Sequence, residues 1–143
     1  MPSENTCQLV VGRLLEIRVD AGYRSPAGVD AMIAMVKNLL APLSPHERIV
    51  IAADWRRCAV LGAGTAERAV AMFNSNPRIL RSGILIMPDS PTALMQVMRL
   101  VSEAKLADRR VFTSPEAQMQ WLGEVTTPKE QARLGAFLAR LGS

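Results

Sequence analysis

The 143-residue chain is 49% hydrophobic and 21% charged, which is the size and balance of a single globular domain able to fold without a metal or a disulfide. Its formal net charge of +4 comes from 17 basic and 13 acidic residues spread along the sequence, and this spread disfavours a nucleic acid partner, because nucleic-acid-binding proteins cluster their basic residues. Two cysteines and one histidine supply neither a disulfide framework nor a multi-histidine metal site, so we expect no metal and no cofactor.

The sequence begins with a polar stretch, residues 1–5, that lacks the basic and then apolar pattern of a signal peptide. No apolar run approaches the roughly 18 residues that a membrane-spanning helix needs. We therefore expect a cytoplasmic protein without a membrane span, in which residues 1–6 form a disordered tail.

Two strands are predicted next, at residues 7–11 and 14–19, joined by Gly12-Arg13. Glycine in the first position of a two-residue loop is typical of a type II′ hairpin turn. In the second strand the apolar residues alternate with polar ones, among them Glu16 and Arg18. This period of two predicts that one face of the hairpin is buried and that the face with Glu16 and Arg18 is exposed to solvent.

Proline preceded by serine or threonine marks the start of four predicted helices, and the last of these also has a capping box formed by Thr127 and Glu130. Short apolar runs between the helices predict buried strands. The elements predicted after the hairpin are, in chain order, a helix over 26–40, a strand over 48–53, a helix over 65–73, a strand over 83–87, a helix over 91–104, a strand over 110–113, a helix over 115–122 and a helix over 128–141.

This order, two strands followed by alternating helices and strands, predicts an α/β fold with a mixed, largely parallel sheet. It resembles the STAS-like (SpoIIAA-like) fold, and more closely the bacterial STAS/SEC14-like proteins. The resemblance covers residues 7–123 and implies an N-terminal hairpin with the helices mainly on one face of the sheet. It is carried by the hairpin, the strand that leads to Asp54, the strand Gly83-Ile84-Leu85-Ile86 and the segment Met87-Pro88-Asp89-Ser90-Pro91. Residues 124–143 form an added C-terminal helix, either packed on the domain or used for dimerisation.

Phosphorylated antagonists of the STAS-like family carry a serine in the loop after the third strand, and a phosphate there breaks the partner interface. In this chain the matching stretch is residues 61–65, Leu-Gly-Ala-Gly-Thr, and Thr65 is the single hydroxyl residue in it. The chain therefore departs from the phospho-switched pattern, while a role in binding a protein or a ligand stays open.

The segment from Asp54 to Arg57 follows the carboxyl end of a buried strand, where open α/β sheets bind ligands. Trp55 beside Arg56 and Arg57 suits a protein contact, and the alternative is a tryptophan packed over the end of the sheet. Gly62 and Gly64 precede the amino terminus of the next helix, where free N–H groups attract a small anion. The alternative here is a tight turn that brings the helix onto the sheet.

We expect a non-enzymatic regulatory module that docks a protein partner through this loop, with Asp54, Trp55, Arg56, Arg57, Gly62, Gly64 and Thr65 as candidate contacts. The alternative is a small-molecule or lipid carrier of the SEC14-like kind, with an apolar cavity lined by methionine and leucine. A Cys58–His46 nucleophile pair is disfavoured because a buried, inert Cys58 is the more common arrangement. A homodimer through the C-terminal helix is the alternative to the packing of that helix on the domain.

Overall fold

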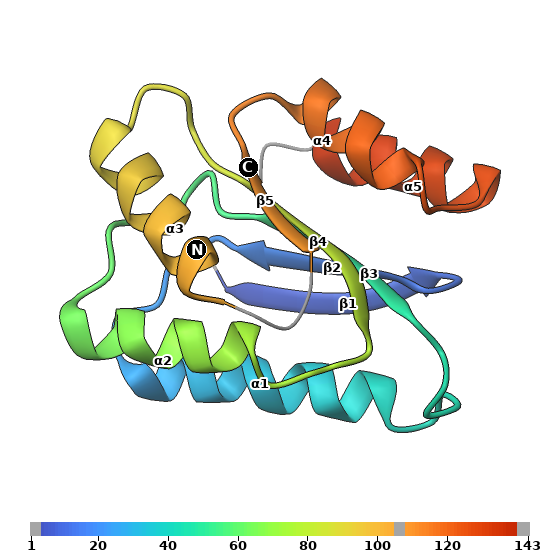
Figure 1. The fold of residues 1–143 in the computed structure, drawn as a ribbon, viewed down its shortest axis with the longest axis horizontal. Coiled ribbons are helices and arrows are strands. Elements are labelled where there is room, and N and C mark those ends of the chain that lie inside the picture. Colours follow the sequence, from blue (N-terminus) through green and yellow to red (C-terminus); the bar gives the residue numbers. More distant parts are fainter. Residues whose placement is uncertain (1–3, 105–107, 140–143) are drawn as a thin grey trace.

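The computed structural model describes residues 4–104 and 108–139. Five strands and five helices follow one another in the predicted order within these residues (Figure 1). They are β1 (Asn5–Val11), β2 (Leu14–Val19), α1 (Pro26–Leu40), β3 (Ile49–Asp54), α2 (Ala63–Phe73), β4 (Ile79–Leu85), α3 (Pro91–Glu103), β5 (Asp108–Phe112), α4 (Pro115–Gly123) and α5 (Pro128–Ala139).

The five strands form one mixed sheet in the order β1-β2-β3-β4-β5. β1 and β2 pair antiparallel, and each later strand pairs parallel with the one before it. Gly12 has a φ of 56°, in the left-handed region that favours glycine, whereas Arg13 does not. These are the φ signs of a type II′ turn, so the predicted hairpin is confirmed. The three parallel strand pairs confirm the predicted, largely parallel sheet.

Helices cover both faces of the sheet, which corrects the expectation that they lie mainly on one. α1, α2 and α3 connect successive parallel strands, and right-handed connections place such helices on the same face. α4 and α5 follow the last strand and pack on the opposite face (Figure 1). β3 contributes alternate residues to the two cores: Ile51 and Ala53 face α1–α3, whereas Val50 and Ala52 face α4 and α5.

The face of β2 that was expected in solvent is buried beneath α5. Glu16 and Arg18 are 3% and 6% exposed, respectively. The Arg133 guanidinium donates two hydrogen bonds to the Glu16 carboxylate, at 2.6 and 2.7 Å, and Arg18 donates one to the carbonyl of Phe137 at 2.7 Å. The prediction was wrong because these partners lie 117 and 119 positions away in the sequence, where local alternation carries no information.

The predicted capping box of α5 forms and also joins that helix to the hairpin. Glu130 accepts a hydrogen bond from the Thr127 N–H at 2.9 Å, and Thr127 Oγ1 accepts one from the Glu130 N–H at 3.2 Å. The second oxygen of Glu130 accepts from the Arg13 N–H at 2.7 Å. A Cβ at Gly12 would overlap this carboxylate, so glycine is required there by the contact as well as by its φ.

Several predicted boundaries move; for example, α2 begins at Ala63 rather than at Thr65, and β5 begins at Asp108 rather than at Arg110. β1 begins at Asn5, so the last two residues of the expected tail belong to the sheet, while residues 1–3 lie outside the described part. β4 begins at Ile79 rather than at Gly83, because polar residues in this stretch obscured the strand in the sequence. α5 packs on the sheet, the last four residues of the predicted C-terminal segment lie outside the described part, and a dimer stays a prediction.

Candidate functional site

The carboxyl end of β3 is held by a buried cluster of charged groups. Asp54, whose side chain is 4% exposed, accepts a hydrogen bond from Arg18 and two from the Arg56 guanidinium, each at 2.9 Å. Arg56 also donates to the Leu138 carbonyl at 3.0 Å. These contacts tie β2, β3 and α5 together, so Asp54 and Arg56 hold the fold at the point where the sequence predicted a binding site.

Trp55 is buried rather than exposed, at 3% of its surface. Its ring packs edge-on against Tyr23, with centroids 5.6 Å apart, and tilted against Phe73 at 6.1 Å. This is the packed alternative for Trp55, because a side chain enclosed by two other rings offers no contact area to a protein partner.

The rest of the predicted loop divides between the surface and the core. Arg57, Gly62 and Gly64 are exposed, whereas Thr65 is 5% exposed. The loop is anchored on α3 through Gln96, whose side-chain amide bonds both the N–H and the carbonyl of Leu61, at 2.8 and 2.7 Å. The structure therefore does not bring the seven predicted residues together on one surface.

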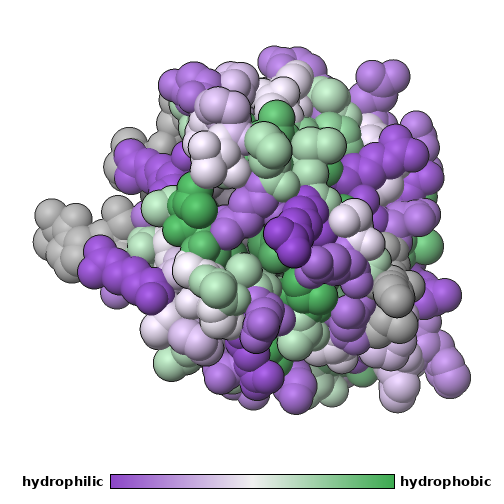
Figure 2. Space-filling model, turned by 60° about the vertical axis from the view of Figure 1, so that its left-hand side comes forward, coloured by the Kyte–Doolittle hydropathy of each residue, from purple (hydrophilic) through white to green (hydrophobic). Residues whose placement is uncertain are grey.

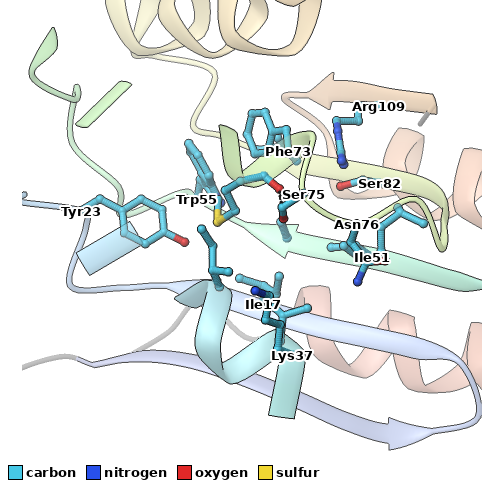
Figure 3. A pocket seen from close by; sticks show the side chains of 16 residues that line it. Ile17, Tyr23, Lys37, Ile51, Trp55, Phe73, Ser75, Asn76, Ser82 and Arg109 are labelled. Carbon is cyan, nitrogen blue, oxygen red and sulfur yellow. Dashed lines mark hydrogen bonds between the residues drawn. The ribbon is translucent and has the colours of Figure 1, made fainter. Parts of the chain in front are cut away.

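A pocket lies between α1, α2 and the sheet, on the far side of Trp55 from the loop residues, and we call it the α1–α2 pocket (Figure 3). Its cavity volume is about 70 Å³. Five isoleucines, Met72 and the rings of Tyr23, Trp55 and Phe73 form most of its wall. The sequence predicted a cavity rich in methionine and leucine; this one has a single methionine and no leucine among its lining residues, because β-branched residues of the strands supply the wall.

Polar groups enter the α1–α2 pocket at a few points. Lys37 on α1 and Ser75 and Asn76 after α2 line it near the surface, and Ser82 and Arg109 line it from β4 and β5 (Figure 3). Ser82 and Arg109 are partners in the pairing of the two strands, so both side chains emerge on the same face.

Two polar atoms of lining residues are buried without a hydrogen-bond partner among the described residues: the Tyr23 hydroxyl and Arg109 Nε. The Arg109 guanidinium lies over the Phe73 ring, 5.2 Å from its centroid. Burial lowers the pKa of Arg109 to about 10, so the group is still a cation at neutral pH. Buried polar atoms are normally paired, which makes these two the sign of a missing partner.

Sequence reasoning missed Arg109, although a signal was present. Arg109 and Arg110 are adjacent in a predicted strand, and successive strand residues point to opposite faces. Arg110 accordingly lies over the Trp121 ring beneath α4, at 4.9 Å, while Arg109 faces the α1–α2 pocket. The packing of α1 and α2 decides which face of the sheet has the pocket, and the sequence of β5 alone does not predict that packing.

The two cysteines are poor nucleophiles. Burial raises the pKa of the Cys7 thiol to about 12 and that of Cys58 to about 11, so both are protonated near neutral pH. In the described part of the chain, no three histidine, cysteine or acidic side chains converge in a way that could hold a metal ion. No helix of that part is both long and apolar enough to cross a membrane.

Comparisons of the chain with family models, with curated proteins and with solved structures give no match. The resemblance to STAS-like proteins therefore stays a prediction, and the mixed α/β fold stands on the structure alone.

Proposed function

We propose that the protein is a non-enzymatic binding module that takes a small apolar ligand, or the apolar part of one, in the α1–α2 pocket. The observation that carries this proposal is an apolar cavity whose wall includes two buried polar atoms, Tyr23 Oη and Arg109 Nε, for which the described residues provide no hydrogen-bond partner. Ligand sites typically combine an apolar wall with a few polar groups that orient the ligand.

The size of the cavity limits the ligand. An engineered apolar cavity of about 150 Å³ is filled by one benzene molecule. On this scale the 70 Å³ of the α1–α2 pocket encloses about three carbon atoms, and the rest of a longer ligand lies toward the surface, near Lys37, Ser75 and Asn76. This volume supports a small ligand. It is too small for the acyl chains of a membrane lipid, the ligand that the carrier alternative included.

Calorimetric titration with pentan-1-ol tests this proposal. Ala53 lines the pocket and is 4% exposed, so Ala53→Leu fills the cavity with three further carbon atoms. We expect the unaltered protein to bind pentan-1-ol and the A53L variant to bind it at least tenfold more weakly. Ala52→Leu, on the opposite face of the same strand, is the matched control. Equal affinity of A53L and the unaltered protein would contradict the proposal.

A second candidate function is the docking of a protein partner through the loop after β3. It is supported by Arg57 and Val60, which are three positions apart in the loop and both exposed; Val60 is 49% exposed. Figure 2, which brings the α3 side forward, shows hydrophobic residues on that face separated by hydrophilic ones, so such a contact is local rather than broad. The site differs from the predicted one in that Trp55 and Arg56 do not take part.

Native mass spectrometry of the gently purified protein tests this second candidate. A partner of defined mass should appear with the unaltered chain and disappear when Arg57→Glu and Val60→Ser are combined. Arg24→Glu, another exposed arginine, is the control and should retain the partner. Retention of the partner by the double variant would remove the loop from consideration.

A further inference from the structure

The charges around the α1–α2 pocket are of one sign. Lys37 and Arg109 line it, and among the described lining residues none is acidic. The two cations differ in their surroundings, since Lys37 is exposed and Arg109 is partly buried. An anionic group that enters the pocket therefore meets attraction from both and repulsion from no lining carboxylate.

Arg109 has no carboxylate partner among the described residues, whereas the buried Arg18 and the nearly buried Arg56 have one. Arg18 and Arg56 each form an ion pair with Asp54, and Arg133 pairs with Glu16. In the described part of the chain, no carboxylate forms an ion pair with Arg109. A partly buried guanidinium without a carboxylate is costly, and a carboxylate brought by a ligand offsets that cost.

The position of Arg109 defines where that carboxylate would lie. Its guanidinium lies over the Phe73 ring, and in Figure 3 its side chain lies beside Ser82, at one end of the pocket. The Ser82 side chain faces the same end, and its hydroxyl can donate a hydrogen bond. The isoleucine and aromatic wall extends from there toward Tyr23, so an apolar stretch separates Arg109 and Ser82 from the Tyr23 hydroxyl (Figure 3).

We infer that the ligand of the α1–α2 pocket is a small aliphatic monocarboxylate, with its carboxylate on Arg109 and Ser82 and its hydrocarbon chain against the isoleucine wall. This inference rests on the proposed function and adds the chemical class of the ligand. A planar carboxylate matches a guanidinium in shape and charge. A phosphate dianion would need more donors than one guanidinium and one hydroxyl in a mainly apolar cavity.

The test compares pentanoate with pentan-1-ol, two probes with the same unbranched five-carbon skeleton, by calorimetry at pH 8. We expect the unaltered protein to bind pentanoate about tenfold to a hundredfold more tightly than pentan-1-ol, because only the carboxylate forms a charge-assisted hydrogen bond with Arg109. Arg109→Met should abolish this preference and leave the affinity for pentan-1-ol within about threefold, because the chain contacts stay. Arg110→Met changes the neighbouring arginine on the other face, and it should retain the preference.

Every outcome of this comparison either supports or overturns the carboxylate inference. Equal affinity of the unaltered protein for the two probes, or a preference that persists in R109M, would overturn the carboxylate inference and leave the pocket as a binding site. Absence of binding by either probe would overturn the proposed function as well. If R109M fails to fold by circular dichroism, Arg109→Gln serves in its place, since it retains a donor and removes the charge; a preference that survives in R109Q would also overturn the inference.

Discussion

Asp54 accepts hydrogen bonds from two guanidinium groups and from the backbone N–H of Arg56, while only 4% of its side chain is exposed. Removing one member of such a buried cluster leaves the others charged and without a partner. Asp30 offers a contrast within the same chain, because its ion pair with Arg68 has both side chains 49% exposed. An exposed pair contributes little, since water solvates both groups when the pair is broken.

The first prediction concerns these two aspartates. Asp54→Ala should lower the free energy of unfolding by about 3–5 kcal/mol, because Arg18 and Arg56 lose their carboxylate inside the fold. Asp30→Ala should lower it by no more than about 1 kcal/mol. Urea denaturation of both variants measures the difference. Losses of similar size would mean that the Asp54 cluster does not stabilise the fold.

α5 is attached to the hairpin at its amino-terminal end by one side chain. Glu130 is 3% exposed and accepts the N–H groups of both Thr127 and Arg13. The capping box alone satisfies a donor of the helix, and the bond to Arg13 extends it across 117 positions of sequence. α5 therefore belongs to the core of the domain, since it also buries Leu134, Phe137 and Leu138 against the sheet.

The second prediction tests that attachment. Glu130→Ala should destabilise the protein by about 1–3 kcal/mol, because two backbone donors lose a partly buried acceptor. Glu103→Ala is the matched control: its ion pair with Arg99 on α3 is exposed, so a loss of about 0.5 kcal/mol or less is expected. Denaturation midpoints and hydrogen exchange in β1 and β2 report the two effects. Unaltered protection of the hairpin in E130A would contradict the attachment.

Local sequence patterns predicted the helices and strands well, but they carry no information on contacts between segments that are distant in the sequence. Proline after serine or threonine marked helix starts, and the Thr127–Glu130 capping box formed as predicted. Glu16 was predicted in solvent because α5, which covers it, lies more than a hundred residues later. The α1–α2 pocket was foreseen only as a kind of cavity. The place of its cation, Arg109, depends on which face of β5 lies toward Phe73 of α2.

The whole molecule has two cores that differ in packing. The core beneath α4 and α5 includes Ala52, which is fully buried, whereas Ala53 on the opposite face lines the α1–α2 pocket. Because the same strand contributes to both cores, equal substitutions on its two faces compare a filled core with one that contains a cavity. Extra carbon atoms strain a filled core and occupy space in the other.

The third prediction follows from that difference. Ala52→Leu should destabilise the protein by about 1–3 kcal/mol through overpacking, while Ala53→Leu should cost less than about 1 kcal/mol because its added atoms enter the cavity. The two variants have the same strand propensity, so their difference in urea midpoint reports packing alone. A larger loss for A53L than for A52L would show that the cavity is closed in solution.

The central claim is that a small ligand enters the α1–α2 pocket, and methyl-resolved NMR during a titration with sodium pentanoate tests it most directly. The account predicts that the methyl signals of Ile17, Ile51 and Ile84, which line the pocket, shift with the ligand. The signals of Leu14, Leu122 and Leu138, in the core of the opposite face, should stay in place. Shifts confined to surface methyl groups, or no shifts at all at millimolar ligand, would contradict the claim.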